Sequence, residues 1–255
     1  MAVLKIRTHK FKEAIQLLEE AKSISPSWAM PYNNISFANT KLENPDKAIS
    51  EALKAHELND KIDAPYHNLS RAYLLKKDVE KSLEYDKLIL EKDPNDCFAI
   101  NNMGYKYAGI EKYDEAEKLY NKALDCNYNL MIAHINRSML KFYNNRAEEA
   151  ISDLKDAIGK VDEPDQIYDQ LGYFYEEQKE NSKAIESYKE AVKINPNNIN
   201  CRYYMASLLI KEKQFDEAII ELQLYIDKKG LKSPRAYFDI ACAYANKNDL
   251  VSFKE

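Results

Sequence analysis

Amide side chains recur at a fixed spacing, and their chemistry is suited to binding. Five of them stand 34 residues apart: Asn34, Asn68, Asn102, Asn136 and Gln170. A carboxamide carries both a donor and an acceptor, so it can pair with both polar groups of a peptide backbone. We call these five residues the amide ladder and expect it to hold an extended peptide.

Residues with the spacing of a catalytic or metal site are absent from the sequence. His9, His56, His67 and His134 have neither each other nor a cysteine at metal-ligand spacing. No glycine-rich phosphate loop, G-x-S-x-G turn or H-E-x-x-H helix occurs. We therefore predict that the chain is not an enzyme and holds no metal and no cofactor.

Composition restricts the partners and the compartment. The net charge is −5 with acidic and basic residues interleaved, so we do not expect nucleic acid as a partner. No signal peptide and no apolar run of about 20 residues occurs, which predicts no membrane insertion. The cysteines form no C-x-x-C pair, and we interpret them as buried small hydrophobic residues of a cytoplasmic protein: Cys97, Cys126, Cys201 and Cys242.

The elements that position the ladder are indicated by columns of small residues with the same spacing. Only Gly, Ala or Ser fits where two helix backbones approach closely. One column is Ala14, Ala48, Ser82, Ala116, Ala150, Ala184 and Ala218, and two further columns run parallel to it. Tyr168, Leu171 and Tyr175 follow the i, i+3, i+7 spacing of one helix face. The columns predict pairs of antiparallel helices.

Repeat boundaries follow from the phase of these columns. Six complete repeats of 34 residues are predicted at 29–62, 63–96, 97–130, 131–164, 165–198 and 199–232. Ser25-Pro26, Asp93-Pro94 and Asn195-Pro196 are expected to end helices between repeats. A partial repeat is predicted over 1–28, with a shortened first helix, and another over 233–255, ending just inside a second helix. We expect one domain over 1–255, whose uncapped ends indicate either a fragment of a longer protein or covered ends.

The pattern resembles the tetratricopeptide repeat over essentially the whole chain. The family order of aromatic, apolar, small, aromatic, then Ala, aromatic, Ala and Pro is matched by Tyr168, Leu171, Gly172, Tyr175, Ala184, Tyr188, Ala191 and Pro196. The resemblance implies an all-α, right-handed superhelical solenoid of antiparallel helix pairs. It also implies that the first helices line a concave groove.

The groove positions of such a repeat are the second, fifth, sixth, ninth, twelfth and thirteenth. On this basis the predicted peptide-binding residues are Asn34, Asn68, Arg71, Phe98, Asn101, Asn102, Tyr105, Asn136, Met139, Asp169, Gln170, Tyr173 and Tyr203. Only Arg71, Lys41 and Lys211 are groove cations, too few for phosphate recognition. The alternative is that asparagine is common in the family and serves local packing.

One subclass of ligand does not fit the sequence. Co-chaperones of this family bind chaperone C-termini with Lys at the fifth, Asn at the ninth and Arg at the sixth position. None of these residues stands at those positions here. We therefore expect a non-enzymatic adaptor or scaffold that binds an extended peptide of another partner. The alternatives are a regulatory or targeting arm of a larger enzyme, such as a glycosyltransferase, and self-association through the ends.

One repeat departs from the pattern. His134, Arg137 and Lys141 replace aromatic or apolar residues of the other repeats. Repeat 131–164 is therefore either the least well packed, and a site of bending, or a tolerated variant in which Arg137 extends its charge to the surface. We favour the second interpretation.

Overall fold

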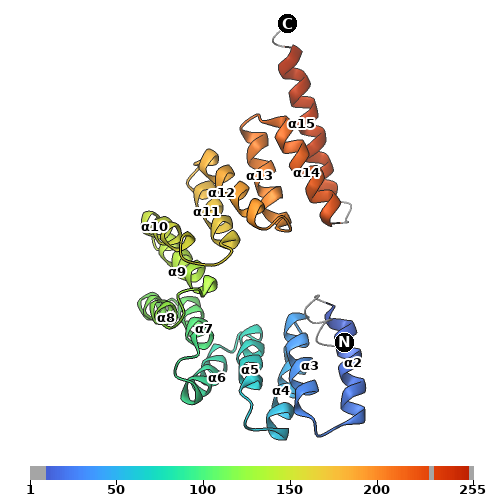
Figure 1. Ribbon diagram of the computed structural model, residues 1–255, viewed down its shortest axis with the longest axis vertical. Coiled ribbons are helices and arrows are strands. Elements are labelled where there is room, and N and C mark those ends of the chain that lie inside the picture. Colours follow the sequence, from blue (N-terminus) through green and yellow to red (C-terminus); the bar gives the residue numbers. More distant parts are fainter. Residues whose placement is uncertain (1–9, 230–232, 253–255) are drawn as a thin grey trace. The chain divides into compact units, whose positions relative to one another are not determined.

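The computed structural model describes residues 10–229 and 233–252, and it contains helices without strands in these ranges. The predicted all-α class is confirmed (Figure 1). The helices are α2 Phe11–Ile24, α3 Ala29–Lys41, α4 Pro45–Leu58, α5 Ala64–Leu75, α6 Val79–Lys92, α7 Cys97–Gly109, α8 Tyr113–Cys126, α9 Met131–Tyr143, α10 Ala147–Ile158, α11 Asp165–Glu177, α12 Asn181–Ile194, α13 Ile199–Lys211, α14 Phe215–Lys229 and α15 Pro234–Ser252.

Helix ends between repeats lie where proline predicts them. α2, α6 and α12 end at Ile24, Lys92 and Ile194, directly before Ser25-Pro26, Asp93-Pro94 and Asn195-Pro196. Proline disfavours the helical conformation of the residue before it, which stops each helix there.

The turns within the repeats are built from non-glycine residues in the left-handed region. Glu43, Lys77, Glu111, Asn145, Lys179 and Lys213 have φ between 56° and 63° and lie 34 residues apart. The N–H of the next residue bonds the carbonyl five residues back, as from Asn44 to Asn39 at 2.9 Å and from Gln214 to Leu209 at 2.8 Å. This is the Schellman end of a helix, which satisfies carbonyls that would otherwise lack a donor.

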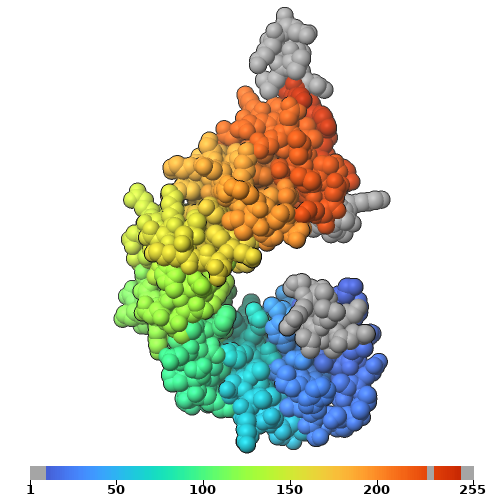
Figure 2. All heavy atoms as spheres, in the orientation of Figure 1, coloured from blue at the N-terminus to red at the C-terminus, as the bar shows by residue number. Residues whose placement is uncertain are grey.

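The chain forms two compact units, unit 1 over 1–126 and unit 2 over 127–255. Within each unit, successive helices pack side by side, and their atoms fill the space between them (Figure 2). The small-residue column beginning at Ala14 is fully buried through Ala218. A single domain over 1–255 with six complete repeats stays a prediction.

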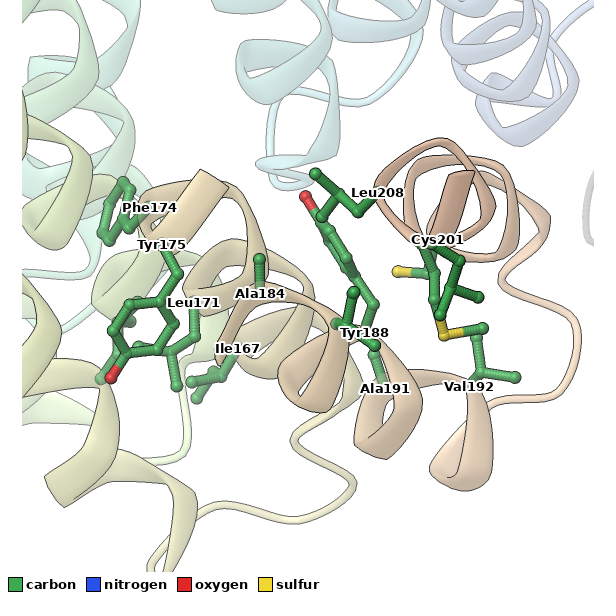
Figure 3. Close-up of a cluster of buried hydrophobic side chains, with 14 of the residues drawn as sticks. Ile167, Leu171, Phe174, Tyr175, Ala184, Tyr188, Ala191, Val192, Cys201 and Leu208 are labelled. Atoms are coloured by element: carbon green, nitrogen blue, oxygen red, sulfur yellow. The ribbon is translucent and has the colours of Figure 1, made fainter. Parts of the chain in front are cut away.

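Close packing explains why two repeats carry glycine in the first helix. A Cβ on Gly172 would lie 2.5 Å from Cε1 of Tyr188, and a Cβ on Gly104 would lie 2.8 Å from Cε1 of Tyr120. Both tyrosines are about 1% exposed, so the rings have no room to withdraw. In unit 2, Tyr188 lies among Leu171, the alanines of α12 and residues of α13 (Figure 3). Glycine is therefore the partner that a buried tyrosine requires here.

The unusual polar residues of repeat 131–164 are accommodated by local partners. His134 is 2% exposed, and its Nε2 lies 2.8 Å from the carbonyl of Tyr128. Lys141 and Arg137 both pair with Asp153, at 2.6 Å and 3.2 Å. The favoured interpretation of Arg137 as a charge carried to the surface needs refinement, because its side chain is 19% exposed and shares a carboxylate.

One detail of the helices differs from the sequence-based expectations. The last repeat was expected to turn into a second helix before Glu255, but α15 runs unbroken from Pro234 to Ser252. No residue of α15 adopts the left-handed conformation that ends the first helices of the other repeats. The shortened first helix expected before α2, and the end of the chain at Glu255, lie outside the described residues.

The cysteine interpretation was wrong for one pair. Cys97, the first residue of α7, and Cys126, the last residue of α8, form a disulfide with Cα atoms 5.7 Å apart. Cys126 is exposed, whereas Cys201 is buried as expected and Cys242 is half-buried. The antiparallel pairing of α7 and α8 brings the two bonded helix ends together, which residue spacing alone does not reveal.

Candidate peptide-binding faces

Every residue predicted to bind peptide lies on a first helix of a pair. In unit 1 these helices are α3, α5 and α7, and in unit 2 they are α9, α11 and α13. We call the surface formed by the predicted residues of each unit its first-helix face. The two faces are described separately.

The first-helix face of unit 1 presents two aromatic rings and an amide on α7. Phe98 is 59% exposed and Tyr105 is 55% exposed, and Asn102 is exposed between them. Residues three and four apart on a helix are neighbours, so the three side chains follow one line along α7. Arg71 on α5 is exposed as well. The line offers apolar contact and backbone pairing together.

The ladder residue Asn68 is occupied within the protein. It is 7% exposed, and its Nδ2 donates to the carbonyl of Asn33 at 3.1 Å and to Oδ1 of Asn33 at 2.9 Å. These bonds join α5 to α3 and use the donors of the Asn68 amide. Asn34 and Asn102 each accept a 3.5 Å bond from the preceding asparagine, and Asn101 is buried. Of these amides, Asn102 is the one left exposed to solvent.

The first-helix face of unit 2 is bonded largely to itself. The hydroxyls of Tyr173 and Tyr143 lie 2.5 Å apart, and this bond, with burial, raises the pKa of Tyr173 to about 12. Tyr203 donates to Asp239 at 3.0 Å, and burial together with this contact raises the pKa of Tyr203. Tyr143, which is 60% exposed, was not among the predicted residues although it holds the thirteenth position of its repeat.

The remaining predicted residues of unit 2 are half-buried. Asp169 accepts a 3.4 Å bond from Asn198, and Met139 packs against the hydrophobic core. Asn136 is engaged in an interaction of its own. The Nε2 atom of Gln170 is buried without an acceptor among the described residues. Unit 1 therefore offers more unoccupied groups to a ligand than unit 2.

A buried charged cluster in unit 1 was missed by the sequence analysis. Lys106 on α7 pairs with Asp86 on α6, and their side chains are 2% and 1% exposed. Lys106 also donates to Oγ of Ser70 at 2.6 Å, and that hydroxyl donates to Asp86 at 2.5 Å. The cluster connects three helices of two consecutive repeats.

Burial penalises both charges of this pair. It raises the pKa of Asp86 and lowers the pKa of Lys106, and in both cases burial outweighs the attraction of the partner. The signal in the sequence was the position of Lys106: it is the tenth of its repeat, where the other repeats have Ala38, Ala72, Leu140, Phe174 and Leu208.

The geometry defines a helical repeat protein in which the predicted binding residues lie on the first helices of the pairs. Models of the tetratricopeptide repeat match residues 135–199 and 175–237. The helix pairs and these matches agree with the family pattern of the sequence. Together the matches span residues 135–237, and they show that the chain contains tetratricopeptide repeats.

Similar proteins include subunits of large assemblies. The chain is 20% identical over 216 residues to anaphase-promoting complex subunit 3 of Schizosaccharomyces pombe, covering 84% of this chain and 32% of that protein. It is 27% identical over 183 residues to the protein O-mannosyl-transferase TMTC3 of Homo sapiens, covering 66% of this chain and 20% of that protein. The crystal structure of the APC/C hetero-tetramer Cut9-Hcn1 matches with a TM-score of 0.64 at 11% identity, over 95% of this chain and 48% of that chain.

The solved structure supports the fold alone at this identity. The chain spans less than a third of the length of the two curated relatives. Among the described residues, none of the helices has the length and apolar character needed to cross a membrane.

Proposed function

We propose that this protein is a non-enzymatic adaptor or scaffold that binds an extended segment of a partner protein on its first-helix faces. The observation that carries the proposal is the line of Phe98, Asn102 and Tyr105 on α7. Rings this exposed leave apolar area in water, and a partner that covers them gains the free energy of burial. The similarity to a subunit of the anaphase-promoting complex supports a role in assembly.

The structure changes which of the predicted binding residues are suited to a test. Replacing Asn68 would remove bonds between α5 and α3, so a loss of binding could come from altered packing. Phe98, Asn102 and Tyr105 are exposed, and their replacement by Ala should leave stability within about 0.5 kcal/mol per site.

The experiment is selection of a random dodecapeptide display library on the full chain. We expect enriched peptides whose binding weakens at least about tenfold when Phe98 and Tyr105 are changed to Ala. A matched control changes Leu88 and Tyr113, which are 38% and 42% exposed on second helices, and it should keep binding. Equal binding by all three proteins, with unchanged circular dichroism, would rule out the first-helix face of unit 1.

A second candidate function is a regulatory or targeting arm of a larger enzyme. The similarity to TMTC3, which is named as an O-mannosyl-transferase, favours it. Sequencing the transcript beyond both ends of the chain tests this candidate, because a catalytic domain in the same frame would support it. Self-association through the ends is a further proposal, and light scattering over a hundredfold concentration range tests it.

A cytoplasmic location is also a proposal. The disulfide between Cys97 and Cys126 argues against this location, because persistent disulfides are characteristic of oxidising compartments. Counting free thiols in protein that is taken directly from cells and unfolded before labelling tests the location: four free thiols support the cytoplasm, and two contradict it.

A further inference from the structure

Two cations on the first-helix face of unit 1 have no acidic partner among the described residues. Lys41 is the last residue of α3 and Arg71 lies on the neighbouring α5, and both are exposed. The only other predicted groove cation, Lys211 in unit 2, lies 3.6 Å from Glu176. Lys41 and Arg71 therefore leave a positive charge uncompensated on this face.

The two charges are close enough to influence one another. Burial, as the larger cause, and the positive charge of Arg71 lower the pKa of Lys41. The ammonium of Lys41 lies 5.5 Å from the ring centre of Phe37, which also occupies a groove position. The ring steadies the cation but supplies no negative charge.

Two acids of unit 1 already have other partners. Asp46 on α4 pairs with Lys76 at 2.7 Å, and Asp96, directly before α7, pairs with His67 at 3.2 Å. An anion that approaches Lys41 and Arg71 from outside therefore meets no competing carboxylate from these two residues, and it relieves the repulsion between the two cations.

We infer that Lys41 and Arg71 form a subsite for the side-chain carboxylate of an Asp or Glu in a bound peptide. This inference rests on the proposed function and specifies the chemistry of its ligand. Adjacent packed helices lie about 8–10 Å apart, so the two cations can converge on one carboxylate between α3 and α5. Phe37 provides apolar contact for the methylene groups of that side chain. The net charge of −5 gives the chain no general attraction for acidic peptides, so the preference must come from this subsite.

The experiment uses the peptides selected on the wild-type chain. We expect Asp and Glu to be enriched in them, and binding of an enriched peptide to weaken about five- to twentyfold in a Lys41→Gln/Arg71→Gln variant. The control variant, Lys118→Gln/Lys122→Gln, makes the same change in net charge on the second helix α8 and should bind as wild type does. A charge-reversed Lys41→Glu/Arg71→Glu variant, selected afresh, should enrich Lys and Arg instead.

The outcomes separate this inference from the proposed function. If peptides depend on Phe98 and Tyr105 but carry no acidic enrichment, or bind both Gln variants equally, the subsite is refuted and the adaptor role stands. If no peptide depends on Phe98 and Tyr105, the proposed function fails first. Tighter binding of peptides in which phosphoserine replaces the acidic residue also refutes the carboxylate subsite, whereas weaker binding of those peptides supports it.

Discussion

Replacing the buried pair of Lys106 and Asp86 separates two views of its role. One view is that the pair stabilises unit 1, and the other is that each charge is tolerated only because its partner is present. We predict the second outcome. The perturbation is a double-mutant cycle of Lys106→Met, Asp86→Asn and the combination, which changes shape little and removes one or both charges.

The magnitude follows from the burial of the two side chains, 2% and 1% exposed. Removing one partner of a buried pair leaves an uncompensated charge and costs about 3–5 kcal/mol. In the double variant, the new amide at position 86 can keep the bond with Ser70, and the new thioether at position 106 needs no charged partner. The double variant should therefore lose no more than about 1–2 kcal/mol. The coupling energy is then at least about 4 kcal/mol.

The assay is unfolding by urea, which does not screen charges. The single tryptophan, Trp28, lies just before α3 and reports on unit 1, while far-ultraviolet circular dichroism reports on both units. Unfolding midpoints are compared at equal slopes. In the Lys106→Met variant, burial raises the pKa of Asp86 without the opposing charge of Lys106, so this variant should gain stability relative to wild type as the pH falls from 7 towards 5.

Additive costs would refute the reasoning. If the double variant loses the sum of the two single losses, the charges do not compensate one another and the pair contributes as two independent interactions. A pH-independent cost of Lys106→Met would also contradict the assignment, because it would show that Asp86 carries no penalised charge.

Three further predictions concern individual residues. Burial lowers the pKa of His134. The contribution of His134 to stability is therefore complete above the unfolded pKa of 6.5 and is lost as the pH falls through the lower folded pKa. Unfolding of wild type and His134→Gln at pH 5.5 and 7.5 should show a smaller pH effect in the variant. Reduction of the Cys97–Cys126 bond, which closes 29 residues, should cost about 3–4 kcal/mol in urea unfolding, and Cys126→Ser should show no effect of reductant. Gly172→Ala should lower the unfolding free energy by about 1–2 kcal/mol, because its Cβ would lie 2.5 Å from Cε1 of the buried Tyr188. Gly159→Ala should not lower it, because a Cβ there meets nothing within 4 Å. A thermal scan of both variants distinguishes them.

The repeating pattern determined the helices, because it depends on local properties. The column from Ala14 to Ala218 marks where two helices of a pair touch, and proline after Ser25, Asp93 and Asn195 marks where helices end. Both signals act within one repeat, over a few turns of helix. Placement of the predicted binding residues on first helices followed from the same phase.

Contacts between repeats decided what the sequence could not. Asn68 belongs to the amide ladder by spacing, but its bonds to Asn33 depend on how α5 packs on α3. Lys106 stands at a position that is apolar in the other repeats, and only its contact with Asp86 of the preceding repeat explains a charge there. These partners are separated by 35 and 20 residues, and no local periodicity specifies which side chains meet over such distances.

The turns that reverse the chain decided two further features, the left-handed residues and the disulfide. Lys77 and Lys213 adopt the left-handed conformation that glycine usually supplies, because the Schellman bonds of the surrounding turn offset its cost. Cys97 and Cys126 meet because α7 and α8 run antiparallel, so that the start of one lies beside the end of the other. The sequence by itself thus determined the repeat and the helices, whereas the packing of consecutive helices decided which polar groups are occupied and which remain exposed to a ligand.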